Sequence, residues 1–416
     1  MSSNQFVQIH FLTSYPATLL NRDDAGFAKR MPFGGVMRTR ISSQCQKRHW
    51  RTFSGENSLA ELEVPESVRS RRSFEELVVK PLLAEHLDQQ KVRAVTVALM
   101  DFVLGKSEKR KESDEGGDAS DKPKKGAKKV QTNEEKVQEA TTSQLTVLGK
   151  PELDFFVQEV RQIVGKLDDL GGAGDAVKQH FSKEKLKNLR ALKNASGLSA
   201  ALFGRMVTGD VLARGDAAVH VAHAITVHRE QVESDYFSAV DDIVADAGEQ
   251  GSGHINSAEL TSGLYYGYVC IDVALLVSNL IGVSTKEWKN ADLTIAKEIV
   301  ERFIHLVAQV SPGAKKGPTA PYAHSHCVLV EIGSAQPRQL VNAFLKPLTG
   351  TDLIRESYLS LARHMSDYDK MYGSSNKRRL AAMGPSDCFE VEKVVAGGDM
   401  LSLAELGRWS AELIGG

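Results

Sequence analysis

The sequence has few cysteines and no long apolar run. Its four cysteines are scattered over 416 residues, and none belongs to a CxxC pair. This spacing excludes a dense disulfide framework and the common zinc motifs, and it is typical of a reducing compartment. No apolar run reaches the roughly 18 residues that a membrane-spanning helix needs. The amino terminus also lacks the basic and then apolar pattern of a signal peptide. We therefore expect a cytoplasmic protein with no membrane contact.

An excess of charge and the familiar catalytic motifs are also missing. The formal net charge is -1, so a polyanion would have to be met by a local cluster of cations. The patterns GxxxxGK[ST], GxGxxG, HExxH and GxSxG do not occur, which leaves the standard nucleotide, dinucleotide, zinc-protease and serine-hydrolase functions without support. His220, His223 and His228 fit no standard metal spacing, and on an alternating strand they would not all point the same way. We expect no metal and no cofactor.

The remaining composition, 25% charged and 42% hydrophobic, is that of an ordinary globular protein. Alternating polarity predicts a half-buried strand at Phe6–Thr13, and further strands are predicted at Val36–Ile41, Val219–Val227, Leu264–Leu276 and Cys327–Ile332. Helical spacing is found at Phe74–Leu104, Pro151–Leu202, Lys286–Val310 and Leu401–Leu413. Strands at both ends of the chain around a helical block predict an α+β fold with a helical insertion.

One segment within the helical block differs in character from the rest. Lys106–Glu139 contains ten Lys/Arg and nine Asp/Glu with almost no apolar residue. Such a segment cannot bury enough surface to offset its chain entropy, so we expect a disordered insert. Its lysines could touch nucleic acid, but a solvated loop is the favoured interpretation.

The most informative stretch is Arg22–Arg51, which has eight Lys/Arg and two acids, a net charge of +6. Ser42 and Ser43 open a short helix that continues to about Phe53, and Ser43 with Gln46 predicts a capping box. The free N–H groups at a helix start attract anions, and cations follow one turn later. Hydroxyl, amide and cation together suit a phosphodiester backbone without sequence preference. A merely solvated basic face is the alternative.

Two further places are weaker candidates. Tyr236 and Phe237 are adjacent aromatics in the polar, hairpin-like region Glu230–Leu260, where they either anchor the hairpin in a core or stack on a base. The segment from Pro312 to Gly317, which includes Lys315, is a flexible basic turn suited to contact with phosphate.

At these residues the sequence resembles a known family. The stretches LNRDDAGFAKRMPFGG, RTRISSQCQKR, GRMVTGD, AHAITVHREQVESDYFSAVDD, GSGHINSAELTSGLYYGYVCID and PGAKKGPTAPY resemble the CasC family, the backbone subunit of the type I-E CRISPR Cascade complex. They follow the family's order and span about Gln5–Val330.

The resemblance implies a hand-like α+β fold with an RRM-like (ferredoxin-like) palm, an inserted helical fingers domain and a protruding thumb hairpin. The implied domains are the palm at 1–58, the fingers at 59–200 with the charged insert at 106–139, the palm again at 201–229, the thumb at 230–260, and the rest of the palm with a C-terminal helix at 261–416. It also implies a function without catalysis. Several copies coat CRISPR RNA and hold its phosphates, beside other Cascade subunits, and leave its bases free to pair with target DNA.

The resemblance also implies roles for individual residues. Those expected to hold RNA phosphates are Arg22, Lys29, Ser42, Gln44, Lys47 and Arg48. Lys315 is expected to contact RNA because it lies in the basic turn described above. Met206 is expected to wedge beside a kinked nucleotide. Tyr236 and Phe237 match an aromatic pair of the thumb, with tyrosine where tryptophan is expected, a change that preserves stacking. The basic run Lys183, Lys185, Lys187 and Arg190 corresponds only loosely to a place that steers duplex DNA.

An enzymatic function is the alternative. Backbone subunits of related type III complexes cut RNA with an aspartate in the loop before the same serine-rich helix, and here Asp23 and Asp24 occupy that loop. No second acid or histidine nearby completes a metal site of recognisable spacing. The favoured interpretation is therefore that Asp23 and Asp24 pair with Arg22 or with a neighbouring subunit.

Overall fold

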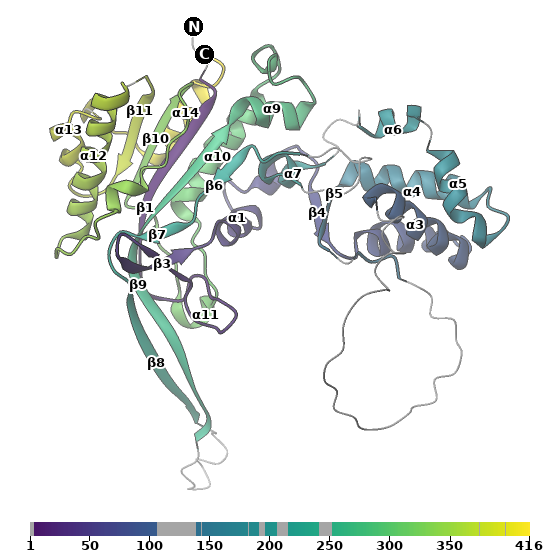
Figure 1. The fold of residues 1–416 in the computed structure, drawn as a ribbon, viewed down its shortest axis with the longest axis horizontal. Helices are drawn as coiled ribbons and strands as arrows, with labels where there is room; N and C mark the ends of the chain where they lie inside the picture. Colours follow the sequence, from purple (N-terminus) through teal and green to yellow (C-terminus); the bar gives the residue numbers. More distant parts are fainter. Residues whose placement is uncertain are drawn as a thin grey trace. The chain divides into compact units, whose positions relative to one another are not determined.

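The computed structural model of the chain describes residues 4–105, 139–142, 144–181, 183–190, 196–205, 215–240, 252–373, 375–395 and 397–416. It divides into two compact units (Figure 1). The larger unit comprises Met1–Leu62, Ala218–Val277 and Val283–Gly416, and the smaller comprises Glu63–Ala217 and Ser278–Gly282. The smaller unit is thus inserted between segments of the larger one. In the part of the chain that is described, no helix is both long and apolar enough to cross a membrane.

One antiparallel sheet forms the frame of the larger unit. Its strands, in chain order, are β1 (Phe6–Thr18), β2 (Arg30–Phe33), β3 (Val36–Ile41), β6 (Val219–Val221), β7 (Ala224–Thr226), β8 (Gln231–Val240), β9 (Ser252–Asp272), β10 (Cys327–Gly333) and β11 (Lys377–Ala382). The spatial order is β11-β10-β1-β9-β7-β3-β2, and β6 and β8 also pair with β9. An antiparallel sheet with helices confirms the predicted α+β class.

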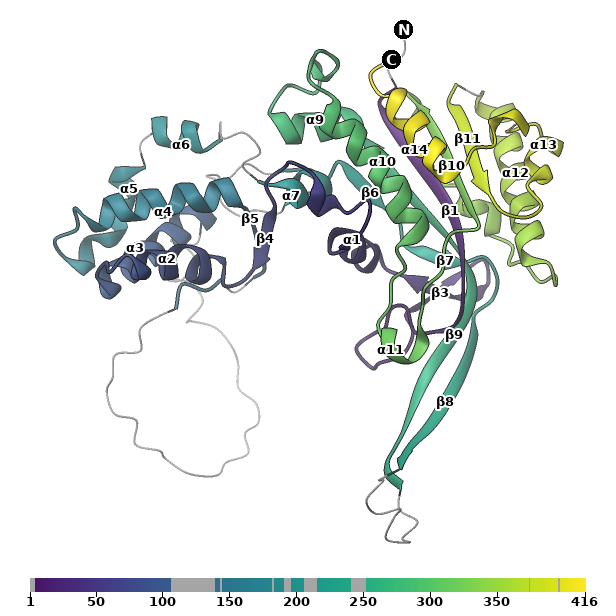
Figure 2. The ribbon, with the colours of Figure 1, turned by 180° about the vertical axis from the view of Figure 1, so that it is seen from behind.

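Helices cover both faces of this sheet (Figures 1 and 2). The helices of this unit are α1 (Ser43–Arg51), α10 (Thr294–Gln309), α11 (Lys316–Thr319), α12 (Leu353–Tyr372), α13 (Asp387–Val391) and α14 (Leu403–Glu412). Helix α9 (Val273–Ile281) begins in this unit, and its residues from Ser278 onward belong to the smaller one. Short 3-10 turns lie at Leu59–Glu61, Trp288–Asn290, Val341–Phe344 and Gly397–Asp399. Tyr358, Leu361 and Met365 of α12 pack against Tyr266 and Leu329 on one face, while α10 and α14 lie on the other (Figure 2).

Strand β1 is buried on both faces, so the prediction of a half-buried strand was wrong. Gln8 and His10 are fully buried, as are Val7 and Ile9. The polar side chains find partners in the core: Tyr268 Oη donates to Gln8 Oε1 (2.9 Å), and His10 Nδ1 lies 2.9 Å from Tyr266 Oη. These bonds hold one polar atom of each side chain, Gln8 Oε1 and His10 Nδ1, in the middle of the sheet.

Strands β8 and β9 form a long hairpin that extends away from the rest of the larger unit in both views (Figures 1 and 2). Their register runs from Gln231 opposite Ser262 to Val240 opposite Ser252. The side chains of β8 from Gln231 to Tyr236 are all exposed. The hairpin therefore adds a surface to the unit rather than a part of its core.

The smaller unit is mainly helical. Its elements are β4 (Ser67–Ser70), a π-helical turn (Glu75–Val79), α2 (Lys80–Ala84), α3 (Gln89–Leu104), β5 (Thr146–Gly149), α4 (Lys150–Val164), a 3-10 turn (Leu170–Gly172), α5 (Ala173–His180), α6 (Lys183–Arg190) and α7 (Leu198–Phe203). Its core includes Phe74, Leu99 and Phe156. A buried ion pair joins Arg205 Nη1 to Glu152 Oε2 at 2.6 Å.

Other predicted elements need correction. Residues 273–276 begin helix α9 and do not continue a strand, and Val219–Val227 is two short strands, β6 and β7. Cys327–Ile332 is not the last strand, because β11 and the long helix α12 follow it. The predicted insert lies outside the described residues except for Glu139.

Candidate nucleic-acid interface

The start of α1 is capped by Ser42, and the predicted capping box of Ser43 and Gln46 is absent. Ser42 Oγ accepts from the backbone N–H of Cys45 (3.2 Å), and its carbonyl accepts from that of Gln46 (3.1 Å). An α-helix leaves its first N–H groups without intrahelical partners. Within the described residues no hydrogen bond is seen for the N–H of Ser43 or Gln44, so two donors remain at the positive end of the helix.

Helix α1 has one buried and one exposed face. Gln46 and Trp50 are buried: Gln46 Nε2 donates to the Ala222 carbonyl (2.9 Å), and the Trp50 ring packs edge-on against Phe303 of α10. Gln44 and Arg48, one turn apart, are exposed. Gln46 is therefore a core contact, and the exposed face presents an amide and a guanidinium beside the capped end.

The loop before β2 is tied to the same helix start. Asn21 Oδ1 accepts from the backbone N–H of Ser42 (2.9 Å), and the Asn21 carbonyl accepts from that of Lys29 (2.8 Å). Arg22 forms an isolated bridge with Ala28. These bonds hold Arg22 and Lys29 on a short closed loop against α1.

The Cys45 thiol lies in the field of two of these cations. Burial raises the pKa of Cys45 to about 11, while the charges of Lys29 and Arg48 oppose this rise. Burial also lowers the pKa of His223, and the charges of Arg40 and Lys29 add to the effect. Arg40 Nη1 lies 3.0 Å from His223 Nδ1. Lys29, Arg40 and Arg48 thus create a positive field around the first turns of α1.

Two cations of the basic stretch do not belong to this field. Arg38 is fully buried, and its guanidinium donates to the carbonyls of Thr226 (2.9 Å) and Phe344 (2.8 Å). Arg30 Nη2 pairs with Glu259 Oε2 at 2.6 Å. Charge counting along the sequence therefore overstates the charge available to a ligand.

The basic turn lies against the same helix. The Gly313 N–H donates to His49 Nε2 (3.3 Å), and the Ala314 N–H donates to the Leu19 carbonyl (2.9 Å). Lys315 directly precedes helix α11 and is half-buried. The structure thus brings together Arg22, Lys29, Ser42, Gln44, Lys47, Arg48 and Lys315 around α1 and its neighbouring loops.

The other predicted residues lie elsewhere. Tyr236 stands on the hairpin with its side chain 67% exposed, so it does not anchor the hairpin in a core. The backbone of Phe237 pairs with Asn256 in the hairpin, and Met206 lies outside the described residues. In the smaller unit, Lys185 Nζ is paired with Glu159 Oε2 at 2.5 Å.

Asp23 has a structural partner. Its Oδ1 accepts from the backbone N–H of Phe27 (2.9 Å), and the two backbones are joined by a further bond (2.8 Å). Asp24 is exposed. Among the residues that the structure describes, no group of three or more His, Cys, Asp or Glu could hold a metal ion. His228 is hydrogen-bonded to Leu264 (3.1 Å) and Arg229 (2.6 Å).

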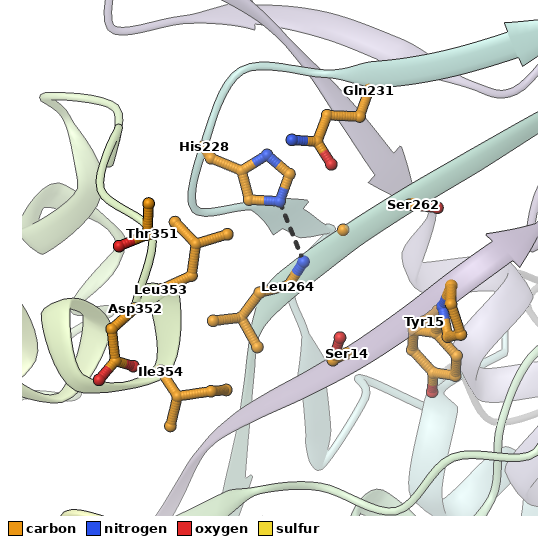
Figure 3. Close-up of a pocket in the computed structure, with 12 residues that line it drawn as sticks. Ser14, Tyr15, His228, Gln231, Ser262, Leu264, Thr351, Asp352, Leu353 and Ile354 are labelled. Atoms are coloured by element: carbon orange, nitrogen blue, oxygen red, sulfur yellow. Dashed lines mark hydrogen bonds between the residues drawn. The ribbon is translucent and has the colours of Figure 1, made fainter.

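A cavity of about 320 Å³ lies at the base of the hairpin (Figure 3). Ser14 and Tyr15 of β1, Gln231 of β8 and Asp352 before α12 line it. His228 and Leu264 also line it, and His228 Nε2 accepts from the Leu264 N–H (Figure 3). It contains none of the predicted RNA-binding residues. The candidate interface around α1 is a basic surface and not a pocket.

The sequence-based predictions missed three residues that build this surface. Asn21 holds the loop, His49 holds the basic turn, and Glu259 pairs with Arg30. An asparagine just before a turn often hydrogen-bonds the nearby backbone, so the role of Asn21 could have been predicted from the sequence. His49 and Glu259 form hydrogen bonds with residues that are distant in the sequence, and no local sequence pattern predicts these contacts.

The chain is similar to a known protein family and to solved structures. A family model described as "CT1975-like protein" matches residues 7–409. The chain belongs to this family. A solved chain of a "CRISPR RNA-guided surveillance complex, pre-nicking" is 25% identical with a TM-score of 0.71, and the match covers 98% of this chain and 99% of that one.

A chain of a "CRISPR RNA-guided surveillance complex" is 21% identical with a TM-score of 0.64 and the same coverage, and it shows likeness of fold. No curated protein matches the sequence. The family match and the surveillance-complex structures confirm the resemblance to the backbone subunits of CRISPR Cascade complexes.

Proposed function

We propose that this protein is an RNA-binding backbone subunit of a type I-E CRISPR Cascade complex. Several copies oligomerise along CRISPR RNA, beside other Cascade subunits, hold its phosphates without sequence preference and present its bases to target DNA. The similar solved chains belong to complexes described as RNA-guided, which supports RNA as the ligand.

The observation that carries this proposal is the capped start of α1. Two backbone donors, the Gln44 amide and the Arg48 guanidinium lie on one exposed surface next to Lys29. Donors of this kind can bind phosphate and sugar hydroxyls, and such contacts carry no information about the base sequence. A protein that coats guides of any sequence needs contacts of this type.

The domains follow from the same proposal. The sheet of the larger unit is the RRM-like palm, the helical insertion is the fingers domain, and the β8–β9 hairpin is the thumb. Tyr236, exposed on that hairpin, is placed to stack on a base or on a neighbouring copy, since every base offers a flat face to an aromatic ring.

We further propose that the subunit does not cut RNA. Asp23 is engaged by the backbone of Phe27 (2.9 Å), and in the described part of the chain Asp24 belongs to no cluster of metal-ligating residues. A metal-dependent nuclease would need such a cluster to generate its nucleophile.

The deciding experiment is to purify the full chain from cells that express a CRISPR array and to analyse the nucleic acid that accompanies it. We expect RNA of uniform length that carries array sequence, bound whatever its spacer. Protein free of RNA, or RNA of random length and origin, would refute the proposal. Guide RNAs with unrelated spacers are the matched controls.

A further inference from the structure

The basic turn is part of a closed loop, residues 311–323. Ser311 Oγ donates to the Ala323 carbonyl (2.8 Å) and accepts from the Ala323 N–H (3.0 Å), which joins the two ends of the loop. Lys315 and Lys316 lie within it, at the start of α11. The loop thus carries two cations on a segment whose base is fixed.

His49 connects this loop to helix α1. The Gly313 N–H can only donate, so His49 Nε2, 3.3 Å away, accepts. The proton of the neutral ring is then on Nδ1, which donates to the Cys45 carbonyl (2.8 Å) within α1. The two ring nitrogens therefore join the loop to the helix.

The surroundings of His49 favour the neutral ring that this contact needs. Burial lowers the pKa of His49, and the positive charges of Lys316 from the loop and Arg48 from the helix lower it further, against hydrogen bonds that raise it. The Cys45 thiol lies 3.7 Å from Nδ1. Lys316 of the loop and Arg48 of the candidate interface thus both act on the same ring.

We propose that His49 is a positioning residue for RNA binding: by accepting from Gly313 it fixes loop 311–323 against α1, so that the loop lysines and Arg48 bind the same stretch of RNA backbone. This inference rests on the proposed function. His49 itself touches no phosphate in this proposal, and it acts through the cations it places.

The test compares His49→Ala, His49→Gln and the double variant Lys315→Ala with Lys316→Ala. The control is His220→Gln, which changes an exposed side chain of β6. Binding of a labelled single-stranded RNA of guide length is titrated at several salt concentrations at pH 7.5. We expect His49→Ala to weaken binding roughly threefold to tenfold, as the loss of one hydrogen bond would. The salt slope is the slope of the logarithm of the binding constant against the logarithm of the salt concentration. We expect His49→Ala to lower its magnitude by about 0.7 for each phosphate contact that is lost, although the substitution removes no charge.

Two further results identify the mechanism. Glutamine can place its amide oxygen where Nε2 lies and accept from Gly313, so we expect His49→Gln to restore both affinity and slope. Adding His49→Ala to the double lysine variant should change binding little, since both act through one loop. Ser311→Ala, which opens the base of the loop without touching α1, should lower the slope in the same way.

The outcomes separate this inference from the proposed function. If the unaltered protein does not bind RNA, the proposed function fails. If it binds RNA but His49→Ala keeps the full salt slope, the role of His49 is refuted while the proposed function stands. If His49→Ala does not fold, the same RNA titration is made with Ser311→Ala. An unchanged salt slope in that variant would overturn the inference.

Discussion

Arg30 Nη2 lies 2.6 Å from Glu259 Oε2, and the other oxygen of the same carboxylate accepts from the backbone N–H of Ala28 (2.7 Å). Glu259 belongs to β9 near the base of the hairpin, and Ala28 lies next to Lys29 in the loop that faces α1. One side chain of the proposed thumb thus holds the loop that carries the proposed phosphate contacts. The position of this loop depends on the hairpin as well as on α1.

This relationship predicts different effects for two substitutions. Glu259→Gln keeps an oxygen for Ala28 and loses only the charge pair with Arg30, which is partly exposed to solvent, so we expect a cost of about 0.2–1 kcal/mol. Glu259→Ala also leaves the Ala28 N–H without its partner, for a total of about 1–3 kcal/mol. Urea denaturation measures both. Equal losses in the two variants would show that the bond to Ala28 contributes nothing.

The capped helix predicts a loss of RNA binding without sequence preference. We expect Lys47→Ala with Arg48→Ala to weaken binding roughly 10- to 100-fold, equally for unrelated guides, and to lower the salt slope by about 0.7 per contact. The matched control is Lys370→Ala with Lys377→Ala, two exposed lysines near β11, at the opposite edge of the sheet from β3 and α1. A loss confined to one guide sequence would contradict the proposal.

The absence of nuclease activity is tested at Asp23 and Asp24. We expect no magnesium-dependent cutting of RNA paired to the guide. Asp23→Asn keeps an oxygen for Phe27 and so preserves the turn, and Asp24→Asn changes an exposed group. Cutting by the unaltered protein that disappears in either variant would replace the structural role with the enzymatic one.

A buried carboxylate predicts how stability changes with acid. Glu331 is fully buried and accepts from Arg378 Nε (2.6 Å) and Arg338 Nη2 (2.9 Å). Burial alone would raise its pKa, but contact with His10 and the charges of Arg378 and Arg338 outweigh burial and lower it to about 2, against an ordinary 4.5. Because the folded pKa is depressed, this stabilisation is complete above about pH 4.5 and is lost as the pH falls toward 2.

We therefore expect Glu331→Gln to cost about 3–5 kcal/mol at neutral pH, since it leaves buried guanidinium groups short of a partner. The difference from the unaltered protein should shrink as the pH falls from 4.5 toward 2. Urea denaturation at successive pH values measures it, with exposed Glu412→Gln as control. A difference that stays constant over this range would mean that Glu331 is not ionised in the folded protein.

Local patterns predicted much of the sheet and the position of the basic helix. Strand β3 matches its predicted bounds, and α1 starts at the predicted serines. The sequence around β1 could not show that Gln8 and His10 are buried, because their partners Tyr268 and Tyr266 come more than 250 residues later. The alternation of polar and apolar residues reports only on the local sequence. It carries no information about a hydroxyl, distant in the sequence, that hydrogen-bonds one of the polar side chains.

The same limit applies to the site. The sequence identified the cations, yet Arg38 is used by the carbonyls of Thr226 and Phe344, and charge counting cannot distinguish such a buried guanidinium from an exposed one. The helix is capped by Ser42 and not by Ser43, and the Gln46 side chain, which the predicted capping box would use, donates to the Ala222 carbonyl. In each case a tertiary contact decided between local alternatives that the sequence leaves close in energy.

The hairpin aromatics are expected to act on the geometry of the RNA more than on its capture. Tyr236 is 67% exposed, and Glu233, Ser234 and Asp235 precede it on β8. Glu233 and Asp235 repel phosphate, so we expect the ring to meet a base or a neighbouring copy, where stacking is worth about 1–3 kcal/mol per base. Replacing Tyr236 and Phe237 with alanine should therefore leave RNA loading nearly intact while it impairs regular assembly and pairing with target DNA.

Loading is measured by the RNA that copurifies, assembly by electron microscopy of the particles, and pairing by titration with complementary DNA. Val232→Ala, which removes a less exposed apolar side chain from the same strand, is the control. A large drop in melting temperature in the double variant would mean that the pair belongs to a core. Normal assembly and normal DNA pairing in the double variant would contradict a role of the hairpin in RNA geometry. Removing an aromatic ring changes the geometry of the RNA only if that ring stacks on a base or on a neighbouring copy.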